Sequence, residues 1–207
     1  MKNKLAALAL TCFCTLANAI TIDATDSGWY TSYGAHSSSN ENFIAGAYSG
    51  SNYRNFFVFD TSSIVGQVTS ATLRINTAEV SAGGNYNLFD VTTSIPTLVA
   101  GGSGLTGIHA DLGSGVNYGN IGILSTQDYQ FINIVLNSNA LAALNAASGL
   151  FAIGGDYVSS SYAFGSSHTT LTRQLILETA EVPEPVSLGL LGLGLLGLAA
   201  ARRRKQA

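Results

Sequence analysis

The sequence predicts a mainly β protein: an antiparallel, jelly-roll-type β-sandwich with one short helix, plus a separate C-terminal hydrophobic helix. Three observations support this fold class. Apolar and polar residues alternate over short stretches in the middle of the chain. Clusters of Gly and Ser separate these stretches and are typical of turns. A single stretch has the alanine-rich composition of a helix. Many short strands with one helix are typical of a two-layered antiparallel sandwich.

Residues 1–19 predict a signal peptide. Two lysines precede an apolar run that ends at Leu16 and is too short to span a bilayer comfortably. Ala17-Asn18-Ala19 fits the small-x-small rule of signal peptidase, so we expect Sec-dependent export and cleavage after Ala19. An uncleaved anchor, a buried helix and a lipoprotein are the alternatives. Both cysteines lie inside this segment, so the processed protein has no thiol for a disulfide or a metal site.

Residues 186–201 predict a transmembrane helix. They are uncharged and rich in Leu and Gly. A helix of this length reaches about 24 Å, and local thinning of the bilayer or snorkelling covers the difference from a ~30 Å hydrocarbon core. A core helix is disfavoured because the glycines destabilise a soluble helix and no polar face exists. The basic residues that follow are expected to stop transfer and stay cytoplasmic: Arg202, Arg203, Arg204 and Lys205.

A short polar motif precedes this helix: Val182, Pro183, Glu184 and Pro185. Two prolines keep the motif extended. Pro-Glu-Pro, an apolar stretch and a terminal Arg cluster, in this order, resemble the PEP-CTERM sorting signal, a segment also catalogued as the ice-binding protein C-terminal domain. The resemblance implies that a membrane-embedded exosortase recognises Pro-Glu-Pro and cuts near it. The precursor would lie in the inner membrane of a Gram-negative bacterium that makes exopolysaccharide, and the product at the cell surface or in the extracellular matrix.

Residues 20–180 have the size of one domain. They contain three arginines, no lysine and ten acidic residues, which gives a net charge of −7. Such a surface argues against nucleic acid and anionic lipid as partners, because both need clustered lysine or arginine.

Six strands are predicted within this domain. Residues 54–59 are strongly apolar and are expected at the centre of a sheet, and 68–75 should place Ala71, Leu73 and Ile75 on one face. The other predicted strands are 85–91, 129–136, 149–153 and 171–177. Glycine-containing turns are predicted at 81–85, 101–104 and 113–115.

The single helix is predicted at 138–149, where alanines dominate. Ser138 or Asn139 is expected to cap its start and Gly149 its end. Leu141 and Leu144 should pack against a sheet edge.

One part of the domain also resembles a known family. Residues 54–75, RNFFVFDTSSIVGQVTSATLRI, resemble the first half of the DNRLRE-type domain. The resemblance implies a jelly-roll sandwich of the carbohydrate-binding-module kind.

Three aromatic residues are candidate glycan contacts: Trp29, Tyr30 and Tyr33. They lie in SGWYTSYG, a polar stretch that we expect to be exposed, and flat aromatic rings can stack on sugars. The alternative is that Trp29 fills one end of the sandwich. Tyr48 and Tyr53, which flank SGSN, are further candidates.

No catalytic residue is predicted. The chain contains neither G-x-S-x-G nor H-E-x-x-H, and its three histidines have no partner spacing. His109 and Asp111 are expected to lie in a loop and face water. Arg54 is expected to pair with an acid. Asp60 and Asp90 should cap turns, since no calcium-loop motif is present, although scattered aspartates leave a structural Ca²⁺ open. No other cofactor or metal is expected.

Taken together, the sequence predicts an exported, exosortase-sorted, non-enzymatic protein with a structural or adhesive role linked to exopolysaccharide. The alternative is a carbohydrate-binding module with a defined glycan ligand. A glycan-active hydrolase, with two converging carboxylates, and an ice-binding protein remain minor alternatives. Ice binding is disfavoured because no threonine repeat is found.

Overall fold

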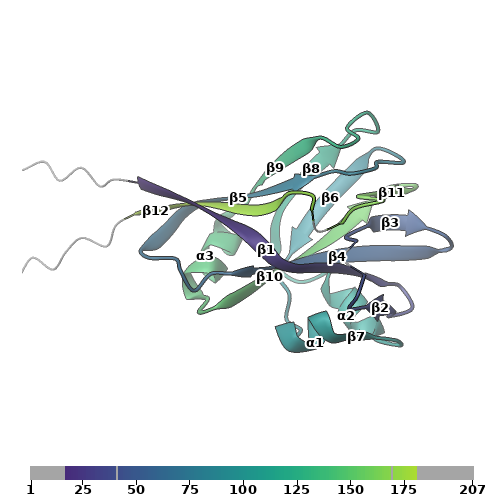
Figure 1. Ribbon diagram of the computed structural model, residues 1–207, viewed down its shortest axis with the longest axis horizontal. Helices are drawn as coiled ribbons and strands as arrows, with labels where there is room; N and C mark the ends of the chain where they lie inside the picture. The colour runs from purple at the N-terminus through teal and green to yellow at the C-terminus, as the bar shows by residue number, and fades with distance from the viewer. Residues whose placement is uncertain (1–16, 41, 169, 181–207) are drawn as a thin grey trace, which may run out of the picture.

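The computed structural model describes residues 17–180 except 41 and 169, and this part of the chain is mainly β, as predicted (Figure 1). The strands are β1 (Ala17–Thr31), β2 (His36–Ser37), β3 (Ala45–Tyr48), β4 (Ser51–Asp60), β5 (Gln67–Asn76), β6 (Gly84–Phe89), β7 (Gly101–Gly102), β8 (Asn117–Ile123), β9 (Phe131–Val135), β10 (Leu150–Val158), β11 (Tyr162–Ala163) and β12 (Arg173–Ala180). The helices are α1 (Ile95–Ala100), α2 (Thr106–Asp111) and α3 (Ser138–Ala146). The prediction of one helix in the domain was therefore wrong.

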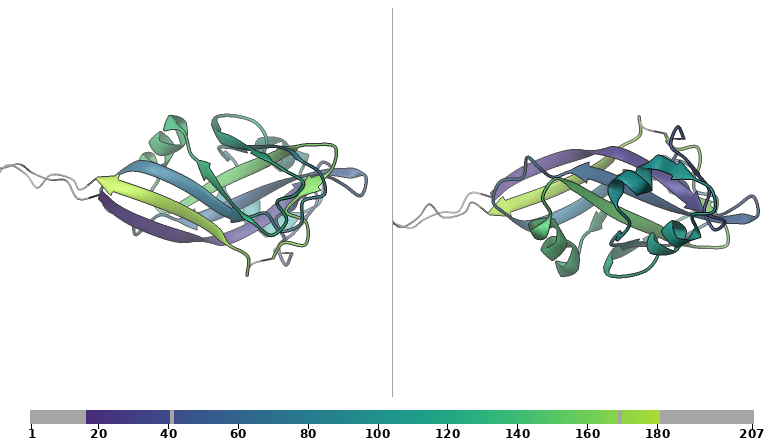
Figure 2. Two further views of the ribbon diagram at one scale, coloured as in Figure 1. Left: turned by 90° about the horizontal axis from the view of Figure 1, so that it is seen from above. Right: turned by 90° about the horizontal axis from the view of Figure 1, so that it is seen from below.

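Two antiparallel layers share the long strand β1. The first half of β1 belongs to sheet A, in the order β1-β12-β5-β9. The second half belongs to sheet B, in the order β1-β4-β10-β6-β8, and β3 and β11 extend sheet B beside β4. β1 changes sheets at a register shift between Ala24 and Asp26. Figure 2 shows the two layers from above and below.

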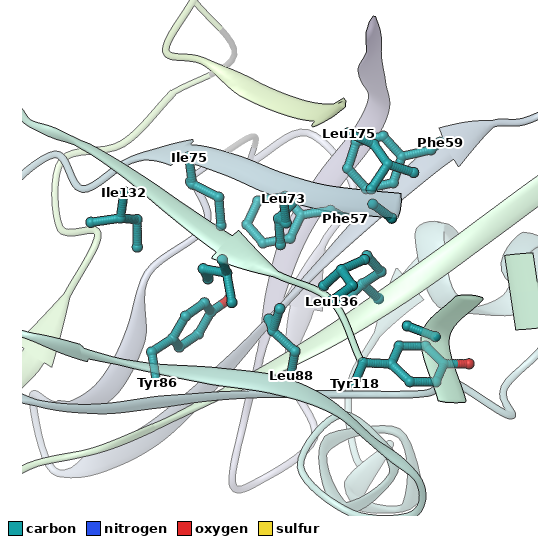
Figure 3. Close-up of a cluster of buried hydrophobic side chains, with 14 of the residues drawn as sticks. Phe57, Phe59, Leu73, Ile75, Tyr86, Leu88, Tyr118, Ile132, Leu136 and Leu175 are labelled. Carbon is teal, nitrogen blue, oxygen red and sulfur yellow. The ribbon is translucent and has the colours of Figure 1, made fainter. Parts of the chain in front are cut away.

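The central strand β4 is buried on both faces, as its apolar sequence predicts. Phe57 and Phe59 belong to the main core between the sheets, whereas Phe56 and Val58 belong to a second cluster. In β5, the alternating residues Ala71, Leu73 and Ile75 are buried as expected. Figure 3 shows the main core, in which side chains of β4 and β5 lie near those of β6, β8, β9 and β12.

The second cluster explains the two helices that sequence reasoning missed. α1 and α2 lie on the outer face of sheet B (Figures 1 and 2). Leu98 of α1 and Ile108 of α2 pack against Phe56 and Val58. Each helix has only six residues, too few for a stable isolated helix, so tertiary packing must hold them.

Helix α3 is the predicted helix, but its N-cap and its end differ from the prediction: it ends at Ala146 with Ala147 as the C-cap, so the prediction of Gly149 as the end cap was wrong. Leu144 is buried and Leu141 packs against the main core, and the helix contacts β5 and β8. The N-cap is Asn137, whose side chain accepts hydrogen bonds from the backbone N–H groups of Asn139 and Ala140. The prediction of Ser138 or Asn139 as the cap was wrong by one or two residues.

Several predictions concern the two ends of the chain. The expected cleavage after Ala19 falls within β1 and would leave Ile20, which pairs with Leu177, as the first residue. Most of the predicted signal peptide and all of the sorting signal, transmembrane helix and basic tail lie outside the described residues. Within the described part of the chain, no helix is both long and apolar enough to cross a membrane.

Candidate functional site

The three aromatic residues predicted to contact glycan have different environments. Tyr30 is fully buried and its hydroxyl donates to the backbone oxygen of Leu98 in α1, at 2.8 Å. The prediction of Tyr30 as an exposed contact was therefore wrong, because α1 and α2 cover its face of sheet B. Tyr33, just after β1, is 71% exposed. Trp29 is half-buried on the opposite face of β1.

Trp29 begins a row of four aromatic side chains, here called the aromatic row: Trp29, Tyr53, Tyr48 and Tyr162. Neighbouring ring centroids lie 5.0 Å apart for Trp29 and Tyr53, 6.0 Å for Tyr53 and Tyr48, and 5.1 Å for Tyr48 and Tyr162. All three contacts are edge-to-face, the geometry that aromatic quadrupoles favour. The row joins β1, β4, β3 and β11.

Strand register explains how the row forms. Gly46 of β3 lies opposite Tyr53 of β4 on one side and Tyr162 of β11 on the other. Gly46 has a φ of 102°, and an added Cβ would lie 2.5 Å from the backbone oxygen of Ser161. Tyr48 follows two residues later on the same face. The absence of a side chain at Gly46 therefore lets the backbones of β3 and β11 lie close together, which brings Tyr162 near Tyr48.

The hairpin that carries Tyr48 ends in a tight turn. Ser49 and Gly50 have positive φ values of 48° and 77°, which a two-residue hairpin turn of type I′ requires. Tyr48 pairs with Ser51 at the base of this turn and is 49% exposed.

An open hollow lies beside Tyr48 and Tyr162. The residues that line this hollow are Asn42, Ile44, Tyr48, Glu79, Tyr162, Gly165 and Ser166. Glu79 is held by two hydrogen bonds: its Oε1 accepts from the Tyr162 hydroxyl at 2.9 Å, and its Oε2 accepts from Ser166 at 3.2 Å. The hydrogen bond to Glu79, together with burial, raises the pKa of Tyr162.

Asn42 is fixed on the other side of the hollow. Its Oδ1 accepts from the backbone N–H of Ile44 at 2.7 Å and from the hydroxyl of Ser167 at 3.0 Å. The oxygen is therefore used within the fold, and the Nδ2 group is the part of the amide left to donate to a ligand.

A second polar cluster holds α2 against sheet B. Arg54 pairs with Asp156, as expected for an arginine near an acid, with an Nε–Oδ1 distance of 3.0 Å. The same guanidinium donates to the backbone oxygens of His109 and Ala110 in α2. These contacts join Arg54 to other parts of the protein and hold α2 in position.

His109 and Asp111 lie on α2, so the prediction of a water-facing loop was wrong. Asp111 accepts hydrogen bonds from the hydroxyls and backbone N–H groups of Thr92 and Thr93. Burial of Asp111 opposes ionisation, but these hydrogen bonds outweigh it and lower the pKa of its carboxyl group. Burial, and then the charge of Arg54, lower the pKa of His109.

Two of the aspartates considered as calcium ligands, Asp60 and Asp90, hydrogen-bond to different parts of the chain. Asp60 accepts from the backbone N–H of Ser62 at 2.9 Å, which confirms its expected turn-capping role. Asp90 accepts from the backbone N–H of Val116, 26 positions away, so it ties two loops together and the expected local cap was wrong. Among the residues that the structure describes, no three His, Cys, Asp or Glu side chains could together hold a metal ion.

Residues 181–205 match the family model of the PEP-CTERM protein-sorting motif. The chain carries a PEP-CTERM sorting motif. This confirms the resemblance found in the tail, and it implies exosortase recognition, export and a membrane-anchored precursor. The match covers the tail alone. The mainly β body is consistent with the expected jelly-roll sandwich. No match is found among curated proteins.

The hollow contains residues that sequence reasoning missed. Tyr48 was considered, but Asn42, Glu79 and Tyr162 were not. Tyr162 lies in SSSYAFGSS, a polar aromatic stretch much like SGWYTSYG, and this likeness is the signal that could have drawn attention to it.

Proposed function

We propose that this protein acts outside the cell in a structural or adhesive role, through contact with exopolysaccharide, at the cell surface or in the extracellular matrix. The observation that carries the proposal is the PEP-CTERM motif at the end of a chain whose folded part presents an aromatic row. Export places the sandwich where polysaccharide is the surrounding polymer. The aromatic row provides surface that can pack on sugar rings.

The placement of the row supports this role. Ala17 and Ala180 pair with each other, so both ends of the described chain lie side by side at one end of the sandwich. β3 and β11, which carry Tyr48 and Tyr162, lie at the opposite end (Figure 1). The sorting motif follows Ala180 directly in the sequence. If the sandwich is held by its tail, the aromatic row therefore lies at the end far from the point of attachment.

The proposal includes no catalytic role. Glycosidases act with two carboxyl groups about 5–10 Å apart. Glu79 is the one acidic residue among those that line the hollow, and it is already bound by Tyr162 and Ser166.

The test is the mass and location of the protein in the cells that make it. Wild type should begin at Ile20, lack residues 186–207 and co-sediment with exopolysaccharide. Replacing Pro183, Glu184 and Pro185 by alanine should leave a tailed protein in the membrane fraction. Glu178→Ala, an exposed change in β12 outside the motif, is the matched control and should be processed normally. Wild type that keeps its tail in the membrane, like the motif variant, would contradict the proposal.

A further inference from the structure

We propose that the hollow beside Tyr48 and Tyr162 binds one ring of a neutral hexose chain. Tyr48 would stack on the ring, and Glu79 and Asn42 would bind its hydroxyl groups. The inference rests on the proposed function, because it names the kind of polysaccharide and the site that contacts it. The site differs from the Trp29–Tyr33 stretch that the sequence indicated.

The aromatic part of the site is a corner of two rings. The rings of Tyr48 and Tyr162 meet at 79° with centroids 5.1 Å apart, and Tyr48 is half exposed. A pyranose ring has an apolar C–H face that packs on an aromatic ring, while its hydroxyl groups point outward from the ring edge. Sites that combine apolar rings with a few convergent polar groups are typical of small-molecule recognition. A sugar stacked on Tyr48 would direct its hydroxyls along the floor of the hollow.

The polar part of the site supplies both an acceptor and a donor. Each carboxylate oxygen of Glu79 accepts one hydrogen bond from the protein, and a carboxylate can accept about four. Lone pairs therefore remain for sugar hydroxyls, and such charge-assisted hydrogen bonds are strong. The Nδ2 group of Asn42 can donate. Because each sugar hydroxyl both donates and accepts, an adjacent pair of hydroxyls matches this pair of side chains.

The charge of the site selects against acidic sugars. Glu79 is the charged residue among the seven that line the hollow, and none of the seven is basic. The domain itself carries a net charge of −7 over residues 20–180, with three arginines against ten acids. A uronic acid would bring a second carboxylate beside Glu79 without a compensating cation, and like charges at short range repel. The site therefore favours a neutral sugar.

The backbone holds the site in place before any ligand arrives. Glu79 and Gly165 exchange two backbone hydrogen bonds of 3.0 Å each. Gly165 has no side chain, and an added Cβ would lie 2.4 Å from Cε2 of Tyr162, so the ring of Tyr162 rests on this glycine. A site whose groups are already ordered loses less conformational entropy on binding.

The experiment measures calorimetric binding of hexasaccharides to the full-length protein in detergent. The probes are cellohexaose, mannohexaose, a galactose hexamer and a galacturonate hexamer. Wild type should bind at least one neutral probe and bind galacturonate more weakly. Tyr48→Ala and Glu79→Gln should each weaken that binding by about tenfold, the scale of one lost stacking or hydrogen-bonding contact.

Two matched variants control for effects of substitution that do not involve the proposed stacking contact. Tyr48→Phe keeps the ring and should bind more tightly than Tyr48→Ala. Tyr33→Ala removes an even more exposed tyrosine outside the hollow and should bind like wild type. Thermal unfolding of each variant shows whether the fold is retained, and the exposed changes at Tyr48 and Tyr33 should match wild type.

The inference is overturned if no neutral probe binds, if galacturonate binds best, or if Tyr48→Ala and Glu79→Gln bind like wild type. Co-sedimentation with the exopolysaccharide of the producing cells separates the two proposals. If wild type and both variants co-sediment equally, the exopolysaccharide role stands and this site is wrong. If wild type does not co-sediment but the hexasaccharide results hold, the site stands and the exopolysaccharide role is wrong.

Discussion

Trp29 and Tyr30 are neighbours in the sequence but lie on opposite faces of β1. Side chains alternate along a strand, so only one of two adjacent residues can face a given layer. Tyr30 faces α1 and is fully buried, whereas Trp29 contacts Tyr53 and belongs to the aromatic row. The sequence suggested exposure for both because SGWYTSYG is polar, and nothing in that stretch indicates that helices further along the chain will cover Tyr30.

Asn55 is a polar residue at a position in β4 where the apolar sequence pattern predicts an apolar side chain. It lies in the buried centre of β4 with no exposed surface. Its Nδ2 donates to the backbone oxygen of Phe43 at 2.7 Å, and its Oδ1 accepts from the hydroxyl of Tyr86 at 2.6 Å. Burial is tolerated because both ends of the amide are satisfied.

A buried histidine predicts that the domain loses stability in mild acid. His36 is 7% exposed, its ring contacts those of Tyr30 and Phe56, and its buried Nδ1 has no hydrogen-bond partner. Burial lowers the pKa of His36 below its ordinary 6.5, although a hydrogen bond to the backbone of Trp29 opposes the shift. Below about pH 6.5 the unfolded chain therefore binds more protons than the folded one, and the free energy of unfolding falls as pH decreases.

We expect His36→Gln to be less stable than wild type at about pH 8 but to lose less stability between about pH 7.5 and 5. One histidine can contribute at most about 1.4 kcal/mol per pH unit. Urea denaturation at several pH values measures this slope. Tyr30→Phe, which removes a buried hydroxyl beside His36, should lower stability and keep the wild-type slope. An unchanged slope in His36→Gln would show that His36 does not cause the acid sensitivity.

Among the elements, strands with clear alternation were predicted and elements that depend on distant partners were not. β4 and β5 lie where their sequences indicated. β1 was missed because its polar second half does not alternate clearly. α1 and α2 were missed because six-residue helices carry little periodicity, and their stability comes from packing on sheet B.

The start of α3 provides a test at this scale. Asn137 accepts from two backbone N–H groups of the first turn, and its Nδ2 donates to the backbone oxygen of Asn117 in β8 at 2.8 Å. Asn137→Ala should therefore lower the free energy of unfolding by about 1–2 kcal/mol. Ser138→Ala, an exposed change at the next position, should stay within about 0.5 kcal/mol of wild type. Chemical denaturation distinguishes them, and equal losses would contradict the assignment of the cap.

At the scale of the whole molecule, β1 is the strand that joins the two sheets. Its first half pairs with β12 and its second half with β4, and Ile20 and Ile22 pack against the main core. The predicted signal-peptide cut after Ala19 leaves both isoleucines in the processed chain. A cut a few residues later would remove these isoleucines and part of the pairing with β12, so it should destabilise the fold.

We expect a chain that starts at Ile20 to unfold at the same urea concentration as one that starts at Ala17. A chain that starts at Thr25 loses two partly buried isoleucines and the pairing with β12. It should lose roughly 4 kcal/mol or more, a large part of the 5–15 kcal/mol typical of a domain. Equal stability of the Ile20 and Thr25 chains would show that the first half of β1 does not join the sheets as described.

By itself, the sequence determined the tail and much of the β pattern. A sorting motif is a linear signal, so Pro183-Glu184-Pro185 and the residues around it can be identified without the fold. Alternation likewise assigned Ala71, Leu73 and Ile75 to one face, because strand geometry is local.

Only the tertiary structure decided which aromatic residues form the candidate site. Asn42, Tyr48, Glu79 and Tyr162 lie on separate segments that the pairing of β3, β4 and β11 and the bridge between Glu79 and Gly165 bring together. The physical reason is that periodicity states which face of a strand a residue occupies. It does not state which strand lies beside it or which helix covers it, and those contacts decide whether a tyrosine is buried like Tyr30 or exposed like Tyr48.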